Sequence, residues 1–198
     1  MGRTATVARE TTETKIALAV DIDGTGQATI HTGIGFFDHM LTLLAGHSLF
    51  DLSIQCEGDV HVDGHHTVED VGRALGVAVK DCLGDRHGIR RYGHSVLPMD
   101  ESLVTAAVDL GGRAATVLAV EYPVPAIGVF DVQLVEVFWE SFAATAGANV
   151  HAVLHHGSNA HHISEAVFKA TARSLRMAVE QDPRQPGVPS TKGVLTDE

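Results

Sequence analysis

One short pattern occurs twice in this sequence, and the repetition limits what the chain can fold into. His65-His66-Thr67-Val68-Glu69 has a second copy, His161-His162-Ile163-Ser164-Glu165, which begins 96 residues later. Apolar residues at helical spacing follow both runs, so we expect two helices that begin with His-His. The copies lie about half the chain apart. This spacing predicts an internal duplication in which each half contributes one such helix.

The residue types in these runs point to metal binding. Residues three and four apart share one face of a helix, so Glu69 can meet the imidazole of His65 or His66. Adjacent residues diverge by about 100°, so the two histidines of one run fit two separate metal centres better than one. Paired histidines at a helix start also serve as caps or surface residues. That alternative accounts for a single copy, but not for two copies with His, His and Glu in register.

The remaining pattern predicts a similar order of elements in each half. Alternating Ile16, Leu18 and Val20 indicate one strand within residues 5–20, and the Asp-Gly turn after it predicts a hairpin with a strand at 27–32. Further strands are expected at 52–56, 60–62, 95–97, 103–110, 114–120 and 148–154, and helices at 38–46, 65–84, 133–145 and 161–180. We therefore expect an internally duplicated α+β fold, in which each half is a small, mostly antiparallel sheet with two helices on one face.

The predicted halves span residues 1–93 and 94–183, and residues 184–198 form a C-terminal tail on the same compact unit. Composition then excludes some functions. The formal charge of −11 argues against nucleic acid as a partner, but a small anion needs only a few local cations. No apolar run reaches the ~18 residues of a membrane helix, and the N-terminus has no apolar signal region. A cytoplasmic location with no membrane partner is the default expectation.

A further ligand candidate follows from the duplication. Aligning Asp38-His39 with the second half places these residues on Glu136-Val137, so acid matches acid but Val137 stands opposite His39. The first repeat therefore offers one ligand more than the second. A lone histidine near a helix start also fits a cap or a surface position.

Cations are few and follow glycines. Arg91 comes after Gly88, Arg113 follows Gly111-Gly112, and Lys192 lies within Ser190-Thr191-Lys192-Gly193. Glycine permits close backbone approach, and Arg or Lys beside hydroxyl groups suits phosphate. Taken singly, each cation fits an ordinary surface role better.

Together these motifs resemble the imidazoleglycerol-phosphate dehydratase family of histidine biosynthesis, over roughly residues 5–195. The motifs that carry the resemblance are Gly35-Phe36-Phe37-Asp38-His39-Met40-Leu41, Gly64-His65-His66-Thr67-Val68-Glu69-Asp70, Gly88-Ile89-Arg90-Arg91-Tyr92-Gly93, Pro98-Met99-Asp100-Glu101, Gly112-Arg113, Ala160-His161-His162-Ile163-Ser164-Glu165-Ala166 and Pro189-Ser190-Thr191-Lys192-Gly193.

The resemblance implies two Mn²⁺ ions per active site and a 24-subunit assembly built from trimers, with the sites between subunits. The metal ligands it implies are His39, His65, His66, Glu69, His161, His162 and Glu165. The residues it implies at a small phosphorylated imidazole substrate are Glu13, His39, His65, Arg91, Arg113, His161, Lys169, Ser190 and Lys192. It also implies Glu13, Glu69 and Glu165 as catalytic carboxylates, with Glu13 as the acid/base.

The sequence departs from the family pattern at one position. Many members have a further metal-binding histidine in the place of Val137. Valine cannot ligate, so one metal either has fewer protein ligands here, with water or a neighbouring group in their place, or binds more weakly.

The reaction that the resemblance implies is loss of water from D-erythro-imidazole glycerol phosphate, giving imidazole acetol phosphate. The hydrogen removed lies on a carbon with no adjacent carbonyl, so the imidazole ring must accept electrons. Our hypothesis is that metal lowers the pKa of the ring N–H to give an imidazolate, while Glu13 moves the protons.

Two other functions compete with this one. A dinuclear metallohydrolase would need metals about 4 Å apart with a bridging carboxylate. A non-catalytic metal-storing or metal-sensing shell protein is the other, and the missing ligand at Val137 keeps it open.

Overall fold

The computed structural model describes residues 2–193 and 195, and its first half is a four-stranded sheet with two helices. The elements are β1 (Thr4–Glu10), β2 (Thr14–Asp21), β3 (Ala28–His31), α1 (Gly35–Ser48), β4 (Asp51–Gly58) and α2 (His65–Leu83). The strand order is β1-β2-β4-β3. Strand β2 pairs antiparallel with both β1 and β4, whereas β3 runs parallel to β4 because α1 connects these two strands.

The second half repeats this topology. Its elements are β5 (Tyr92–Met99), β6 (Ser102–Asp109), β7 (Ala115–Ala119), β8 (Ala126–Ile127), β9 (Phe130–Asp131), α3 (Leu134–Ala146), β10 (Asn149–His156) and α4 (Ala160–Val179). The strand order β5-β6-β10-β7 matches the first sheet position by position, including a parallel pair, β7 with β10, joined through α3. Only the short hairpin β8–β9 has no counterpart among the described elements. The predicted duplicated α+β fold is confirmed.

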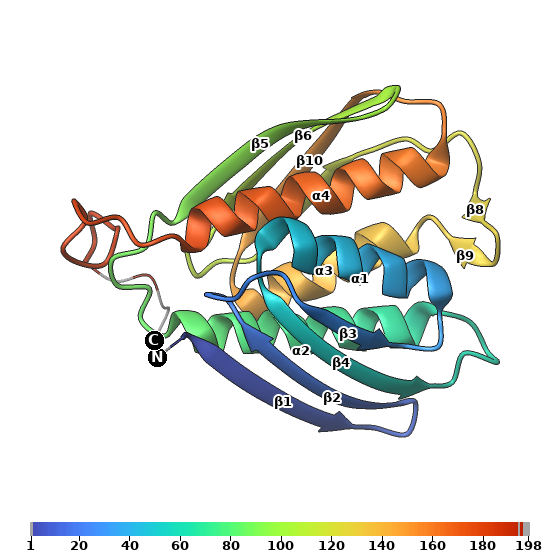
Figure 1. The fold of residues 1–198 in the computed structure, drawn as a ribbon, viewed down its shortest axis with the longest axis horizontal. Coiled ribbons are helices and arrows are strands. Elements are labelled where there is room, and N and C mark those ends of the chain that lie inside the picture. The colour runs from blue at the N-terminus through green and yellow to red at the C-terminus, as the bar shows by residue number, and fades with distance from the viewer. Residues whose placement is uncertain (1, 194, 196–198) are drawn as a thin grey trace.

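The four helices lie between the two sheets (Figure 1). The central strands turn alternate side chains inward: Ile16, Leu18 and Val20 of β2 are all buried, as the period-two pattern predicts. Helix α1 packs against α4, and α2 packs against α3, so both helix pairs cross from one half to the other. Their apolar faces and the inner faces of both sheets share one core. This arrangement brings the first turn of α1 close to the first turn of α4.

Two sequence predictions about the first three strands are wrong. Residues 5–20 form two strands rather than one, and the strand at 28–31 does not return along β2 as a hairpin. Both edges of β2 are already taken by β1 and β4, so no place is left for it. The carboxylate of Asp51 instead accepts the amides of Thr25 and Gln27, which directs the chain onto the free edge of β4.

The predicted strand at residues 60–62 is also wrong. This segment forms a turn, in which Val60 and Val62 are exposed. The two valines lie on a solvent-facing connection and so have no sheet face to pack on.

The described part of the predicted tail lies against the body of the chain. The amide of Gly88 donates to the carbonyl of Gly187 (3.0 Å), and Arg91 Nη1 donates to the carbonyl of Pro189 (2.9 Å). The tail prediction extended to 198; residues 194 and 196–198 lie outside the described residues. Of the helices described, none combines the length and the apolar character that a bilayer crossing requires.

Candidate metal centre and anion-binding pocket

Both His-His-x-x-Glu runs lie at helix starts, as the sequence predicts. Helix α2 begins at His65, and α4 begins one residue before His161. The first free amide of each run has a side-chain acceptor: Asp63 for His65 (2.7 Å) and Asn159 for His161 (2.9 Å). The two rings of each run lie 6.2 Å apart and nearly perpendicular. Neighbouring histidines therefore face different partners.

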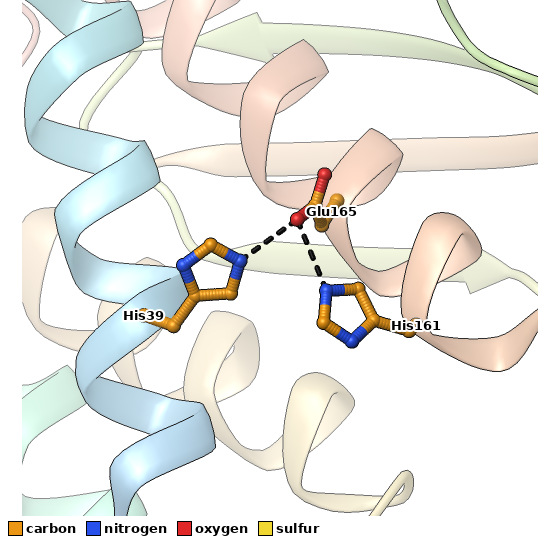
Figure 2. Close-up of side chains that lie close together, drawn as sticks. All are labelled: His39, His161 and Glu165. Carbon is orange, nitrogen blue, oxygen red and sulfur yellow. Dashed lines mark hydrogen bonds and ion pairs between the residues drawn. The ribbon is translucent and has the colours of Figure 1, made fainter.

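Three of the predicted ligands come together within this one chain. We call His39 of α1 with His161, Glu165 and Lys169 of α4 the α1–α4 cluster. His39 Nε2 lies 2.7 Å from Glu165 Oε1, and His161 Nε2 lies 3.1 Å from the same oxygen (Figure 2). One donor atom from each of His39, His161 and Glu165 lies within 4.8 Å of the others. Two imidazole nitrogens and a carboxylate oxygen this close can hold a divalent cation.

The charge of Glu165 is strongly favoured although its side chain is only 8% exposed. Burial opposes ionisation, but hydrogen bonds with Lys169, His39 and His161 outweigh it and lower the pKa of Glu165 to about 2. Lys169 Nζ donates to Glu165 Oε2 at 2.6 Å. Lys169 therefore holds one carboxylate oxygen and leaves the other directed at the two imidazoles.

The pseudo-equivalent residues of the other helix pair are spread more widely. We call Val137 of α3 with His65, Glu69 and Arg73 of α2 the α2–α3 cluster, after the helices that carry it. His65 Nε2 lies 3.8 Å from Glu69 Oε2, and Arg73 Nη1 lies 3.7 Å from Glu69 Oε1. Val137 is half-buried against the core and offers no donor atom. Within the chain as described, His65 and Glu69 do not join the α1–α4 cluster.

The second histidine of each run is held by a carboxylate. His66 Nδ1 lies 2.9 Å from Asp59 Oδ2, and His162 Nδ1 lies 2.7 Å from Glu101 Oε2. These hydrogen bonds raise the pKa of both histidines, and the contact with His162 lowers the pKa of Glu101 to about 2. A histidine that shares Nδ1 with a carboxylate presents Nε2 to a metal in a fixed orientation.

Glu13 lies beside the first of these histidines. It precedes β2, its side chain is 49% exposed, and its Oε1 lies 3.7 Å from His66 Nε2. The amide of Asp59 donates to the Glu13 carbonyl (3.1 Å), so the same segment positions both His66 and Glu13.

The predicted cations line one cavity of about 840 Å³. Its walls include Arg91, Arg113, Ser190 and Lys192, together with Arg90, Tyr92, Gly111, Gln185, Pro189, Thr191 and Leu195. Arg91 forms a two-pronged ion pair with Asp109, at 2.7 and 3.1 Å, whereas Arg113 and Lys192 are exposed. This concentration of positive charge on an acidic chain favours a small anion.

The candidate metal ligands and this pocket lie at opposite ends of the folded molecule. The runs begin α2 and α4, whereas most of the pocket is built from segments that follow the last turns of the same helices (Figure 1). The loop between β6 and β7 adds Gly111 and Arg113. Helix α4 has 20 residues, which corresponds to roughly 30 Å. A small molecule cannot contact both ends of one chain at once.

Sequence reasoning missed several residues of these sites. Glu101 was visible only as part of a motif and could equally have been structural, and Asp59 carries no local signal because it lies seven residues before its partner. Asp109 and Arg86, which shape the pocket, depend on contacts between distant segments.

Comparisons with known proteins identify the family of this chain. A family model described as imidazoleglycerol-phosphate dehydratase matches residues 32–175. The dehydratase of Rhodopirellula baltica is 60% identical over 98% of this chain and 96% of that protein, and that of Acidiphilium cryptum is 54% identical over 98% and 100%. The crystal structure of the Staphylococcus aureus enzyme matches with a TM-score of 0.82 at 33% identity, covering 90% of this chain and 99% of that one. The structure of the Pyrococcus furiosus enzyme matches with a TM-score of 0.83 at 34% identity, covering 96% of this chain and 100% of that one. The chain belongs to the imidazoleglycerol-phosphate dehydratase family.

Proposed function

We propose that this chain dehydrates D-erythro-imidazole glycerol phosphate to imidazole acetol phosphate, a step of histidine biosynthesis, in a metal-dependent site. The observation that carries the proposal is the α1–α4 cluster, in which His39, His161 and the buried Glu165 converge in a member of this family. An acidic chain with one strongly basic pocket also suits a substrate that carries a single phosphate.

The donor atoms fit a divalent metal of intermediate hardness. Imidazole nitrogen and carboxylate oxygen without thiolate suit Mn²⁺, and we propose two such ions per active site. His39, His161 and Glu165 would hold one, with His65, His66, Glu69 and His162 as the remaining ligands. When bound, the metal supplies Lewis acidity that makes the substrate imidazole a better electron acceptor. Glu69 and Glu165 would act as catalytic carboxylates beside His65 and His161.

Other side chains bind and orient the substrate. Arg113, Ser190 and Lys192 receive the phosphate, with Arg91 holding the tail at Pro189 and offering its remaining N–H groups. Lys169 keeps Glu165 ionised and fixed. Glu13 lies next to His66 and is open to solvent, so it can accept the proton from carbon and return one to the departing hydroxyl.

The separation of these groups favours a site shared between copies of the chain. One copy supplies the His-rich end and another the basic pocket, because roughly 30 Å divides them in a single chain. We propose that the copies assemble as 24 subunits built from trimers. Within each copy we propose that residues 1–93 and 94–183 act as one unit, since both helix pairs join the two halves.

The experiment is turnover of imidazole glycerol phosphate by purified protein, after chelation and after reloading with Mn²⁺. We expect the ketone product only in the reloaded sample, without release of inorganic phosphate. Phosphate release would instead identify a metallohydrolase. Bound metal with no turnover of either kind, and no rescue of a histidine-requiring strain that lacks the dehydratase, would identify a metal-storing protein.

A further inference from the structure

A buried arginine lies directly behind the basic pocket. Arg86 follows α2 and is only 1% exposed, which places it among the largest fully buried residues of the described chain. Its backbone adopts a positive φ of 61°, a conformation that non-glycine residues rarely hold unless their surroundings enforce it. Burial lowers the pKa of its guanidinium. A cation is costly to bury, so its place here requires compensating contacts.

The guanidinium joins two segments that are distant in sequence. Arg86 Nη1 donates to the carbonyl of Leu195 (3.1 Å), and Nη2 donates to the carbonyl of Ala146 (2.9 Å). A Cβ at Gly112 would clash with the carbonyl of Leu195, and one at Gly147 would lie 2.8 Å from the carbonyl oxygen of Gly112; both would also lie 3.2 Å from the guanidinium of Arg86. Glycine at these positions therefore lets the tail, the loop and Arg86 meet. The amide of Gly112 donates to the carbonyl of Gly147 (2.8 Å), which ties the loop before Arg113 to the same point.

These segments are the walls of the pocket. The Gly112 loop carries Arg113, and the tail carries Ser190 and Lys192. The tail is held on one side of residues 190–193 by Arg91 at the Pro189 carbonyl, and on the other side by Arg86 at the Leu195 carbonyl. Residues 190–193 therefore form a short loop between two arginine contacts.

We propose that Arg86 is a positioning residue for the phosphate end of the substrate. By binding the tail and the end of α3 with one guanidinium, it sets the distance between Ser190–Lys192 and Arg113 before any ligand arrives. A lysine could not do the same, because a single ammonium lacks the planar fork that reaches two carbonyls. The inference rests on the proposed function only in assuming that the pocket receives phosphate.

The test compares Arg86→Met and Arg86→Lys with Lys80→Met, which removes an exposed cation from the last turn of the same helix. In the Mn²⁺-loaded full-length assembly we expect KM for the substrate, and the inhibition constant of inorganic phosphate, to rise about tenfold or more in Arg86→Met. The kcat value and the metal content should change little. For Arg86→Lys, both constants should lie between those of the wild type and Arg86→Met. For Lys80→Met, both should match the wild type.

Hydrogen–deuterium exchange gives a readout that does not depend on activity. Residues 187–193 and 111–113 should exchange faster in Arg86→Met, by about tenfold, while the first turns of α2 and α4 remain unchanged. Unchanged exchange in the tail, or a fall in kcat with unchanged KM and phosphate inhibition, would overturn the inference. If Arg86→Met does not fold, Arg86→Lys decides on the same measurements. A wild-type protein that does not turn over the substrate would instead refute the proposed function and leave the exchange comparison to judge Arg86.

Discussion

The α1–α4 and α2–α3 clusters occupy equivalent places in the duplicated fold, and each is carried by one helix from either half. Only in the α1–α4 cluster do the side chains contact one another closely. Glu165 is 8% exposed and contacts two imidazoles and an ammonium within 3.1 Å. Glu69 is 39% exposed, and its nearest histidine and arginine atoms lie 3.8 and 3.7 Å away. The second imidazole of the α1–α4 cluster comes from His39, and Val137 stands in its place in the α2–α3 cluster.

The comparison shows that the two halves share their topology but not their candidate metal ligands. Strand order, the parallel crossover pairs and the helix pairing are common to both halves, because both must bury the same kind of helix face. The donor sets are not common to both halves. The α1–α4 cluster brings together three residues that could hold a metal within one chain, whereas the α2–α3 cluster offers two, His65 and Glu69, that lie 3.8 Å apart. The clusters should therefore respond differently to equivalent substitutions.

The largest difference is expected between Glu165→Gln and Glu69→Gln. Glu165→Gln leaves Lys169 largely buried beside a neutral amide, so we expect a loss of about 3 kcal/mol in the free energy of unfolding. Glu69→Gln, at an exposed position, should cost less than about 1 kcal/mol. Denaturant unfolding of the metal-free proteins measures both. Equal losses would show that the two clusters do not differ in burial as described.

Activity should test whether Glu13 transfers protons, as we propose. Glu13 and Glu101 each directly precede the second strand of their half, but Glu13 is 3.7 Å from its histidine and Glu101 is 2.7 Å from its own. We expect Glu13→Gln to lower kcat about 10²- to 10⁴-fold, with metal content unchanged by elemental analysis. Unchanged turnover with intact metal would remove Glu13 from the chemistry.

The sequence predicted the duplicated fold because its signals are periodic and occur twice. It also predicted His39, His161 and Glu165 as ligands, and helix packing alone brings these three together. Pairing of distant segments was harder to predict. The turn after Asp21 has hairpin chemistry, but whether β3 joins β2 or β4 depends on which edge is free. Asp59, Asp109 and Arg86 are invisible locally, since each acquires its role from a partner outside its own segment.

Metal affinity should depend on the carboxylates that hold His66 and His162. Glu101→Gln and Asp59→Asn keep the side-chain size and an acceptor oxygen but lose the charge, so each should weaken Mn²⁺ binding about 10- to 100-fold. The effect of Glu101→Gln should be the larger. Glu101 Oε1 also accepts the amides of Ser158 and Asn159 just before α4. Loss of its charge should therefore also weaken the contacts that hold the start of α4, which carries His161 and Glu165. Metal titration by calorimetry measures both, and equal affinities across wild type and variants would contradict the orienting role.

The smallest expected effect is a gain, from Val137→His. This change would give the α2–α3 cluster the imidazole that His39 gives its counterpart, so Mn²⁺ should bind there about tenfold more tightly. Val137 packs against the core, so we also expect a loss of about 1 kcal/mol in stability. Val137→Leu, which stays apolar, is the matched control. Metal titration of the assembled proteins distinguishes the two variants. If Val137→His binds no more metal than Val137→Leu, and binds it no more tightly, position 137 does not face the metal. The wider spacing of the α2–α3 cluster must then have another cause.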